Sequence, residues 1–234
     1  EAEWTARQEL AACYRIFAMM AWDEMIYNHI TVKVPDEDSS YLINPYGMHF
    51  SEITASSLIK VDIDGNKVDA DNPWHINKAG FVQHSLFHRE KPDMHAIIHT
   101  HTTATHAVCS VEGGLQPSNF YACMLDGKLA YHDFQGITVR AEEGPAFLES
   151  LGDKRIMMLK NHGPVVMGRT LPEAFLNYWA LQRACEIQVK TAAMGKPITV
   201  PPEVIAVHQR DRDLILTDDF GKLERRLDDL AFTL

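Results

Sequence analysis

Residues 94–110, MHAIIHTHTTATHAVCS, hold four histidines within twelve positions: His95, His99, His101 and His106. The apolar run that leads into His99 is typical of a buried strand. Because side chains alternate along a strand, His99 and His101 are expected to point to the same face. Two threonines and an Ala/Val-rich run follow, which predicts a capped helix. The histidine pair would then lie at a strand-to-helix turn, where open α/β sheets bind their ligands.

Two imidazoles side by side at a strand end suit a divalent metal. Ordinary polar residues on a half-exposed strand would give the same pattern, so the pair alone leaves both interpretations open. A second signal is KNHGP at 160–164, where His162 follows another apolar strand. Gly163 and Pro164 predict a tight turn that restricts His162, although a loop histidine can also simply bond to backbone. Three histidines together would match the three protein ligands and open position of many catalytic zinc sites.

Composition describes an ordinary globular chain of 234 residues, 46% hydrophobic and 23% charged, which predicts a substantial core. The formal charge of −10 disfavours nucleic acid and anionic membranes as partners. No apolar run is long enough to cross a bilayer, and the acidic start lacks the features of a secretory signal. The four cysteines form no CxxC motif, so we expect reduced thiols and a cytoplasmic protein.

Periodicity predicts the order of the elements. Helices are expected at 4–22, 77–90, 142–151 and 171–194, besides the one after His101. Strands are expected at 26–34, 41–43, 58–63 with 67–68, 129–134, 156–159 and 165–167. This order predicts one α/β domain whose largely antiparallel central sheet is covered on both faces by helices.

The segments NKAGFVQHSLFHREKPDMHAIIHTHTTATH (77–106), LAYHDFQGI (129–137), KNHGPVVMG (160–168) and LPEAFLNYWALQRACEIQ (171–188) together resemble the class II aldolase/adducin family. The resemblance is strongest to the adducin head and its bacterial relatives. It implies a three-layer α/β/α domain over residues 1–200. We expect residues 201–234 to form a helical tail that packs on the same domain. It also implies a homo-oligomer, often a cyclic homotetramer, with active sites near subunit interfaces.

The same resemblance implies that His99, His101 and His162 bind a divalent metal, usually zinc and otherwise manganese or iron. The family's enzymes include sugar-phosphate aldolases and epimerases, in which the metal polarises a small substrate and stabilises an enediolate.

Several positions depart from the aldolase pattern. Gly80 stands where those enzymes carry an acidic acid/base residue. Lys78-Ala79 replaces serines that cradle phosphate, and Tyr46-Gly47 replaces a Thr-Gly of the same cradle, whereas Asn28 matches a pocket asparagine. We therefore expect a substrate without a phosphate group, contacted by Asn28, Gly47 and Tyr121.

These features predict a metal-dependent lyase that cleaves a C–C bond through a metal-stabilised enolate, as a decarboxylase or aldolase, on a small carboxylate or hydroxy-carbonyl compound. Decarboxylation fits a glycine at position 80, because it needs only a proton donor afterwards. The candidate donors are His84, His88, Tyr121 and Tyr131. The histidines could instead be core residues, and Tyr131 could serve in packing.

Two alternatives stay open: a non-catalytic oligomeric scaffold like the adducin head, and a sugar-phosphate aldolase or epimerase. A scaffold has no need of three ligand histidines. The last residues, 228–234, lack the basic group expected of an actin- or spectrin-binding tail. Both features favour an enzyme.

Overall fold

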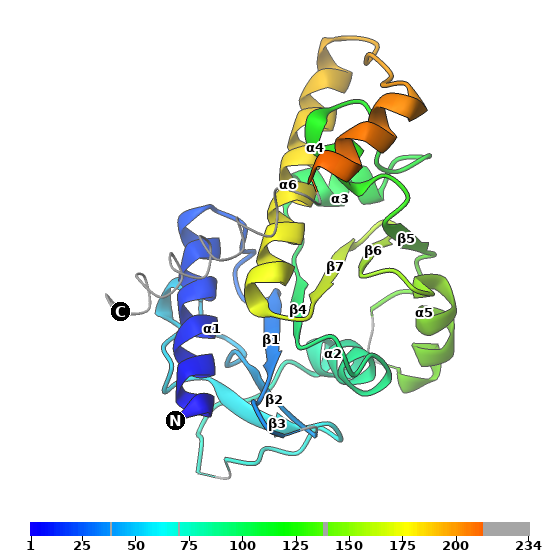
Figure 1. The fold of residues 1–234 in the computed structure, drawn as a ribbon. Helices are drawn as coiled ribbons and strands as arrows, with labels where there is room; N and C mark the ends of the chain where they lie inside the picture. The colour runs from blue at the N-terminus through cyan, green and yellow to red at the C-terminus, as the bar shows by residue number, and fades with distance from the viewer. Residues whose placement is uncertain (38, 70, 138–139, 213–234) are drawn as a thin grey trace.

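The computed structural model describes residues 1–37, 39–69, 71–137 and 140–212. Its elements follow in the order α1 (Ala2–Met19), β1 (His29–Lys33), β2 (Ser40–Ile43), η1 (Phe50–Glu52), β3 (Ile59–Asp62), α2 (Lys78–Glu90), β4 (Ala96–His99), α3 (Thr103–Cys109), α4 (Phe120–Leu125), β5 (Leu129–His132), η2 (Ala141–Glu143), α5 (Gly144–Leu151), β6 (Ile156–Leu159), β7 (Gly163–Gly168) and α6 (Leu171–Met194) (Figure 1).

The strands form one seven-stranded sheet in the order β3-β2-β1-β4-β7-β6-β5. Neighbouring strands are antiparallel except β5 and β6, which run parallel. The prediction of an α/β fold with a mainly antiparallel sheet is therefore confirmed. At the centre, β4 lies between β1 and β7. Its last residue, His99, therefore lies at the C-terminal end of the central strand, in the middle of the molecule.

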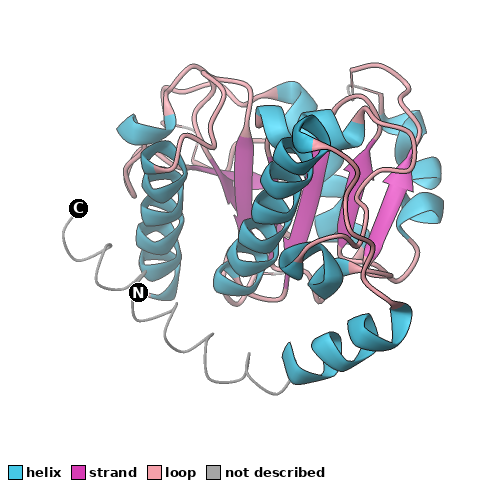
Figure 2. Cartoon of the chain, turned by 90° about the horizontal axis from the view of Figure 1, so that it is seen from above, coloured by secondary structure: helices cyan, strands magenta, loops and turns pink. Residues whose placement is uncertain are grey.

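Strand alternation divides the core between the two faces of the sheet. Ile30, Ile98 and Val166 face the cluster that α1, α3 and α6 cover, whereas Ile97 and Val165 face the cluster that α2 and α5 cover. Figures 1 and 2 show α1 and α6 together on one side of the strands. Burial of these apolar faces is the main force that holds helices and sheet together.

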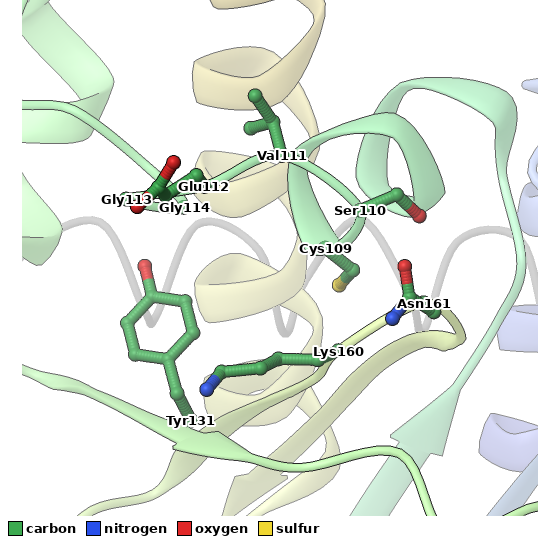
Figure 3. Close-up of a pocket in the computed structure, with 9 residues that line it drawn as sticks. All are labelled: Cys109, Ser110, Val111, Glu112, Gly113, Gly114, Tyr131, Lys160 and Asn161. Carbon is green, nitrogen blue, oxygen red and sulfur yellow. The ribbon is translucent and has the colours of Figure 1, made fainter.

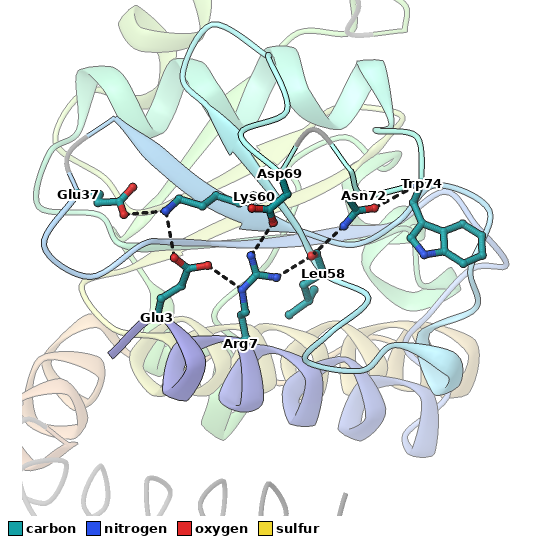
Figure 4. A network of polar contacts seen from close by, with 8 residues as sticks. All are labelled: Glu3, Arg7, Glu37, Leu58, Lys60, Asp69, Asn72 and Trp74. Carbon is teal, nitrogen blue, oxygen red and sulfur yellow. Dashed lines mark hydrogen bonds and ion pairs between the residues drawn. The ribbon is translucent and has the colours of Figure 1, made fainter. Parts of the chain in front are cut away.

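A partly buried polar network fastens α1 to the outer strands (Figure 4). The Arg7 guanidinium pairs with Glu3 and Asp69 at 2.8 Å each and donates to the Leu58 carbonyl at 2.7 Å. Lys60, on β3, binds Glu3 at 3.0 Å. Several partners satisfy the buried arginine, as a largely desolvated charge requires.

Two differences from the predicted elements have local causes. The strand expected at 26–34 begins only at His29, because Met25 adopts a left-handed conformation (φ 48°) and residues 25–26 form a turn. The six-residue helix α4 was not predicted; Asn119 caps it by accepting from the Ala122 N–H.

Residues 202–212 form a further helix, in which Ile205 is buried. Gln209 in this helix donates to the carbonyls of Cys123 and Asp126, at the end of α4. The rest of the predicted tail, residues 213–234, lies outside the described residues. Within the described chain, no helix combines the length and apolarity needed to cross a membrane.

Candidate metal centre

Three imidazoles meet at the end of β4. His99 is the last residue of that strand, His101 lies two residues later, and His162 comes from the turn between β6 and β7. The Nε2 atom of His101 lies 2.9 Å from Nε2 of His99 and 2.9 Å from Nε2 of His162. Sequence positions 61 residues apart are thus brought together because β4 and β7 are neighbours in the sheet.

The residues between the ligands point the other way and are anchored. The Thr100 hydroxyl donates to the Tyr178 hydroxyl of α6 at 2.7 Å, and both side chains are fully buried. Thr102 caps α3 and donates to Gln182, also on α6, at 2.7 Å. Alternation therefore fixes Thr100 toward α6 and turns His99 and His101 to the opposite side.

Hydrogen bonds at Nδ1 set the tautomers of two of the histidines. His99 Nδ1 donates to the Pro164 carbonyl at 2.9 Å, and His101 Nδ1 donates to the Glu24 carboxylate at 2.7 Å. Since a carbonyl and a carboxylate can only accept, each neutral ring leaves its Nε2 as a bare lone pair. Such partners are typical of metal-binding histidines, because they orient the ring and raise its basicity.

Burial keeps these rings neutral. It lowers the pKa of His99 well below the ordinary range, with the nearby imidazoles adding to the effect. Burial likewise lowers the pKa of His162 to about 4. It lowers that of His101 as well, although Glu24 opposes part of the shift. Two lone pairs facing each other 2.9 Å apart repel unless a cation lies between them, so the donor set fits a divalent metal.

The turn that carries His162 depends on two backbone features. Asn161 adopts the left-handed conformation (φ 55°), which asparagine tolerates better than most residues, and its N–H donates to the Cys109 carbonyl at 2.9 Å. A Cβ added at Gly163 would lie 2.4 Å from the Thr100 carbonyl oxygen. Glycine is therefore required for the turn to approach β4 closely enough.

A cavity of about 500 Å³ opens above the three imidazoles. Among the described residues that line it there is no lysine or arginine. Gln83 lines the cavity and is buried, and its amide nitrogen has no hydrogen-bond partner within the described chain. Three aromatic residues of the lining, Tyr27, Tyr46 and Phe134, are exposed. The lining is completed by Glu24, His29, Asn77, His99, His101, His106, Gly136, Ile137, Asn161 and His162.

Several residues of the cavity were not predicted from the sequence, among them Glu24 and His29. Glu24 lies in a turn before β1, and nothing in the sequence relates it to a histidine 77 positions away. His29 pairs directly with His99 across the β1–β4 ladder, and their rings lie 5.1 Å apart. The sequence placed His29 in an expected strand, but the register of that strand with β4 could not be read from the sequence.

The predicted donors His84 and His88 lie beneath the cavity rather than in its lining. Both are fully desolvated on α2. The Thr31 hydroxyl lies 2.7 Å from Nδ1 of His84 and 2.8 Å from Nε2 of His88. His84 Nε2 in turn lies 3.0 Å from Nδ1 of His29. His29 therefore separates both residues from the metal site.

Tyr131 belongs to a second cavity of about 530 Å³, together with Cys109, Gly114 and Lys160 (Figure 3). Its hydroxyl accepts from the Leu115 N–H at 3.0 Å. The two cavities have only Asn161 in common among their described lining residues. The structure thus does not bring Tyr131 into the cavity that holds the three histidines.

The predicted substrate contacts are dispersed. Tyr121 packs against Trp179, with ring centroids 5.2 Å apart, and is absent from the described cavity lining. Gly47 adopts φ 97° in a turn beside Tyr46, which does line the cavity. Asn28 is buried, and neither polar atom of its amide has a described hydrogen-bond partner.

The side chains of Lys78 and Ala79 lie outside the described part of the chain.

Comparisons with known proteins agree with the fold and the motifs. The sequence model of a family described as "Class II Aldolase and Adducin N-terminal domain" matches residues 8–189. A Caulobacter vibrioides protein, whose name places it provisionally in aldolase class 2, is 43% identical over 204 residues, which cover 87% of this chain and 79% of that protein. The crystal structure of an aldolase II superfamily protein from Pseudomonas syringae has a TM-score of 0.91 and 37% identity, and covers 98% of this chain and 94% of that chain.

A different kind of protein is equally similar in sequence. Alpha-adducin of Rattus norvegicus is 43% identical over 194 residues, which cover 82% of this chain but only 26% of adducin. The chain therefore spans about a quarter of that protein.

Proposed function

This chain belongs to the class II aldolase and adducin family, and on that premise we propose that it is a divalent-metal-dependent lyase that cleaves a C–C bond in a small, non-phosphorylated substrate. The observation that carries the proposal is the convergence of three Nε2 atoms. Those of His99 and His101 lie 2.9 Å apart, and the hydrogen bonds at their Nδ1 atoms leave a lone pair on each Nε2. Clusters of metal-competent residues in a cavity are a general mark of function.

Within this site, His99, His101 and His162 would hold the ion. Glu24 and the Pro164 carbonyl orient two of the rings from behind. The metal, when bound, draws electron density from a substrate oxygen and so stabilises the negative charge that C–C cleavage leaves behind, whether in decarboxylation or in aldol cleavage. The protein's own contribution is to orient the substrate and to supply a proton to the carbon afterwards.

The cavity lining supports a non-phosphorylated substrate. A phosphate group is usually held by Arg, Lys or a helix N-terminus, and the described lining offers no cationic side chain. Gln83 offers instead an unpartnered amide nitrogen, which suits a carboxylate or carbonyl oxygen. The exposed aromatic residues of the lining suit a substrate with an apolar part.

Several finer features belong to this proposal. We propose zinc as the ion, with manganese or iron as alternatives, a homotetramer with its active site near subunit interfaces, a cytoplasmic location and a three-layer α/β/α arrangement. Asn28 and Gly47 stay proposed substrate contacts. His84, His88, Tyr121 and Tyr131 stay proposed proton-transfer or contact residues, although the described cavity lining contains none of these four and neither Asn28 nor Gly47.

Metal analysis tests the proposal most directly. Protein purified without chelator should contain about one metal ion per chain, and His162→Ala should lose it. His106→Ala is the matched control, because His106 lines the same cavity without joining the three-histidine cluster. Full metal occupancy in His162→Ala would contradict the ligand assignment.

The reaction is tested by incubating metal-loaded protein with hydroxylated aromatic carboxylates and with short hydroxy-carbonyl compounds. The expected result is release of carbon dioxide or an aldehyde that stops after chelation and returns with metal.

The identity with alpha-adducin supports a second candidate, a non-catalytic scaffold. Stoichiometric metal without turnover of either substrate class would favour that candidate.

A further inference from the structure

Beyond the metal ligands, a row of imidazoles that spans β1 and α2 runs from the cavity wall into the core beneath it. His29 and Thr31 are two positions apart on β1 and therefore lie on the same face of that strand. His84 and His88 lie one turn apart on the side of α2 that faces β1. The strand period and the helix period thus bring four polar side chains into a single hydrogen-bonded chain, with contacts of 3.0, 2.7 and 2.8 Å.

Only one of these four hydrogen-bonded side chains reaches the cavity. His29 lines the cavity, and its Nδ1 is committed to His84. Its Nε2 has no hydrogen-bond partner among the described residues and is not among their fully buried unpartnered atoms. Nε2 is therefore the atom that His29 can present to a bound molecule, beside the ring of His99.

Gly80 gives His29 the room for this position. A Cβ at Gly80 would lie 2.5 Å from Cδ2 and 2.7 Å from Nε2 of the His29 ring. Any larger residue at position 80 would therefore move that ring. The glycine that stands out in the sequence is explained by the imidazole that lies against it.

We infer that His29 is the residue that hydrogen-bonds the substrate beside the metal, and that His84, Thr31 and His88 are positioning residues that hold its ring. This inference rests on the proposed function, which it deepens by naming a further substrate contact.

The chain of four residues controls what His29 presents. Desolvation lowers the pKa of His84 and His88, which favours their neutral forms. A threonine hydroxyl has one hydrogen and must accept from one ring if it donates to the other. When His84 donates to Thr31, His29 donates from Nδ1 and presents a lone pair at Nε2.

When His88 donates to Thr31, every bond in the chain reverses, and His29 presents an N–H at Nε2 instead. The chain thus has two self-consistent neutral arrangements, and it holds the ring in the same orientation in both.

The test uses the full chain loaded with zinc and acetohydroxamate, a small planar chelator, as the probe. Calorimetry measures zinc affinity and probe affinity separately. His29→Phe should weaken the probe at least tenfold, the effect of losing one hydrogen bond to a charged group, and leave zinc affinity unchanged. Gly80→Ala should weaken the probe as well, through displacement of the ring.

Positioning is tested at His84. His84→Leu should weaken the probe, whereas His84→Gln should restore most of the affinity, since its amide can still bond to His29. Thr31→Val also interrupts the row of hydrogen-bonded side chains, and it keeps a β-branched residue in the strand. Far-UV circular dichroism and thermal midpoints confirm that each variant folds.

Equal probe affinity in wild type and His29→Phe, with zinc bound to both, would overturn the inference. Equal affinities in His84→Leu and His84→Gln would overturn the positioning role. A wild-type protein that binds no zinc would overturn the proposed function itself, and the inference with it.

Discussion

The buried histidine His88 makes a quantitative prediction about acid stability. Burial lowers its pKa from 6.5 to about 3, and Lys33 adds to the effect. In the unfolded chain the ring takes up a proton as the pH falls below 6.5, whereas in the folded protein it stays neutral. A depressed folded-state pKa contributes stability that is fully present above pH 6.5 and is lost as the pH falls toward 3.

The magnitude follows from the same values. Between pH 7.5 and pH 5, His88 should account for a loss of about 2 kcal/mol in the free energy of unfolding. His88→Phe removes this titration but also removes the hydrogen bond to Thr31, which costs about 1 kcal/mol. The variant should therefore be about 1 kcal/mol less stable than wild type at pH 7.5 and about 1 kcal/mol more stable at pH 5.

Urea unfolding of chelator-treated protein, followed by far-UV circular dichroism at both pH values, measures the effect. Tyr41→Phe is the matched control, because the Tyr41 ring packs on His88 with centroids 4.9 Å apart and its hydroxyl has no described partner. Its stability should parallel that of wild type. If His88→Phe loses as much stability between the two pH values as wild type does, the reasoning is refuted.

Three further substitutions test the site and its support. Glu24→Gln should weaken metal binding about 10- to 100-fold in a metal titration, because the carboxylate no longer orients His101; unchanged affinity would show that the contact has no such role. Gly163→Ala should lower the unfolding free energy by about 1–3 kcal/mol and reduce metal content, because its Cβ would meet the Thr100 carbonyl. Tyr14→Phe should cost about 1–3 kcal/mol in urea unfolding, because its fully buried hydroxyl accepts from a main-chain N–H of β1 at 2.7 Å; a loss within experimental error would contradict that role.

The parts of the site that are local in sequence were predictable. Alternation in residues 94–110 placed His99 and His101 on one face, and the apolar strand before His162 suggested a second strand end. These inferences depend only on neighbouring residues, and the structure brings the three imidazoles together.

The parts that depend on register were not predictable. His29 faces His99 because β1 and β4 pair in one particular alignment, and no property of either strand alone specifies it. For the same reason, the position of His84 and His88 in a predicted helix could not show that their side chains meet Thr31 rather than the cavity. Tyr131 lies on a strand that was expected, yet that strand forms the edge of the sheet, and Tyr131 lines the second cavity there.

The pairing of β4 with β7 has a consequence for what the ion can contribute. Main-chain bonds already join these strands, from Ala96 opposite Gly168 to His99 opposite Val165. The long segment between the ligands is therefore closed into a loop by strand pairing alone. Metal coordination then adds little stability through loop closure. Small metal domains, in contrast, unfold when their ion is removed, because coordination itself closes their loops. In this protein, replacing a single ligand histidine should abolish metal binding and leave the fold intact, so the metal site and the fold can change independently.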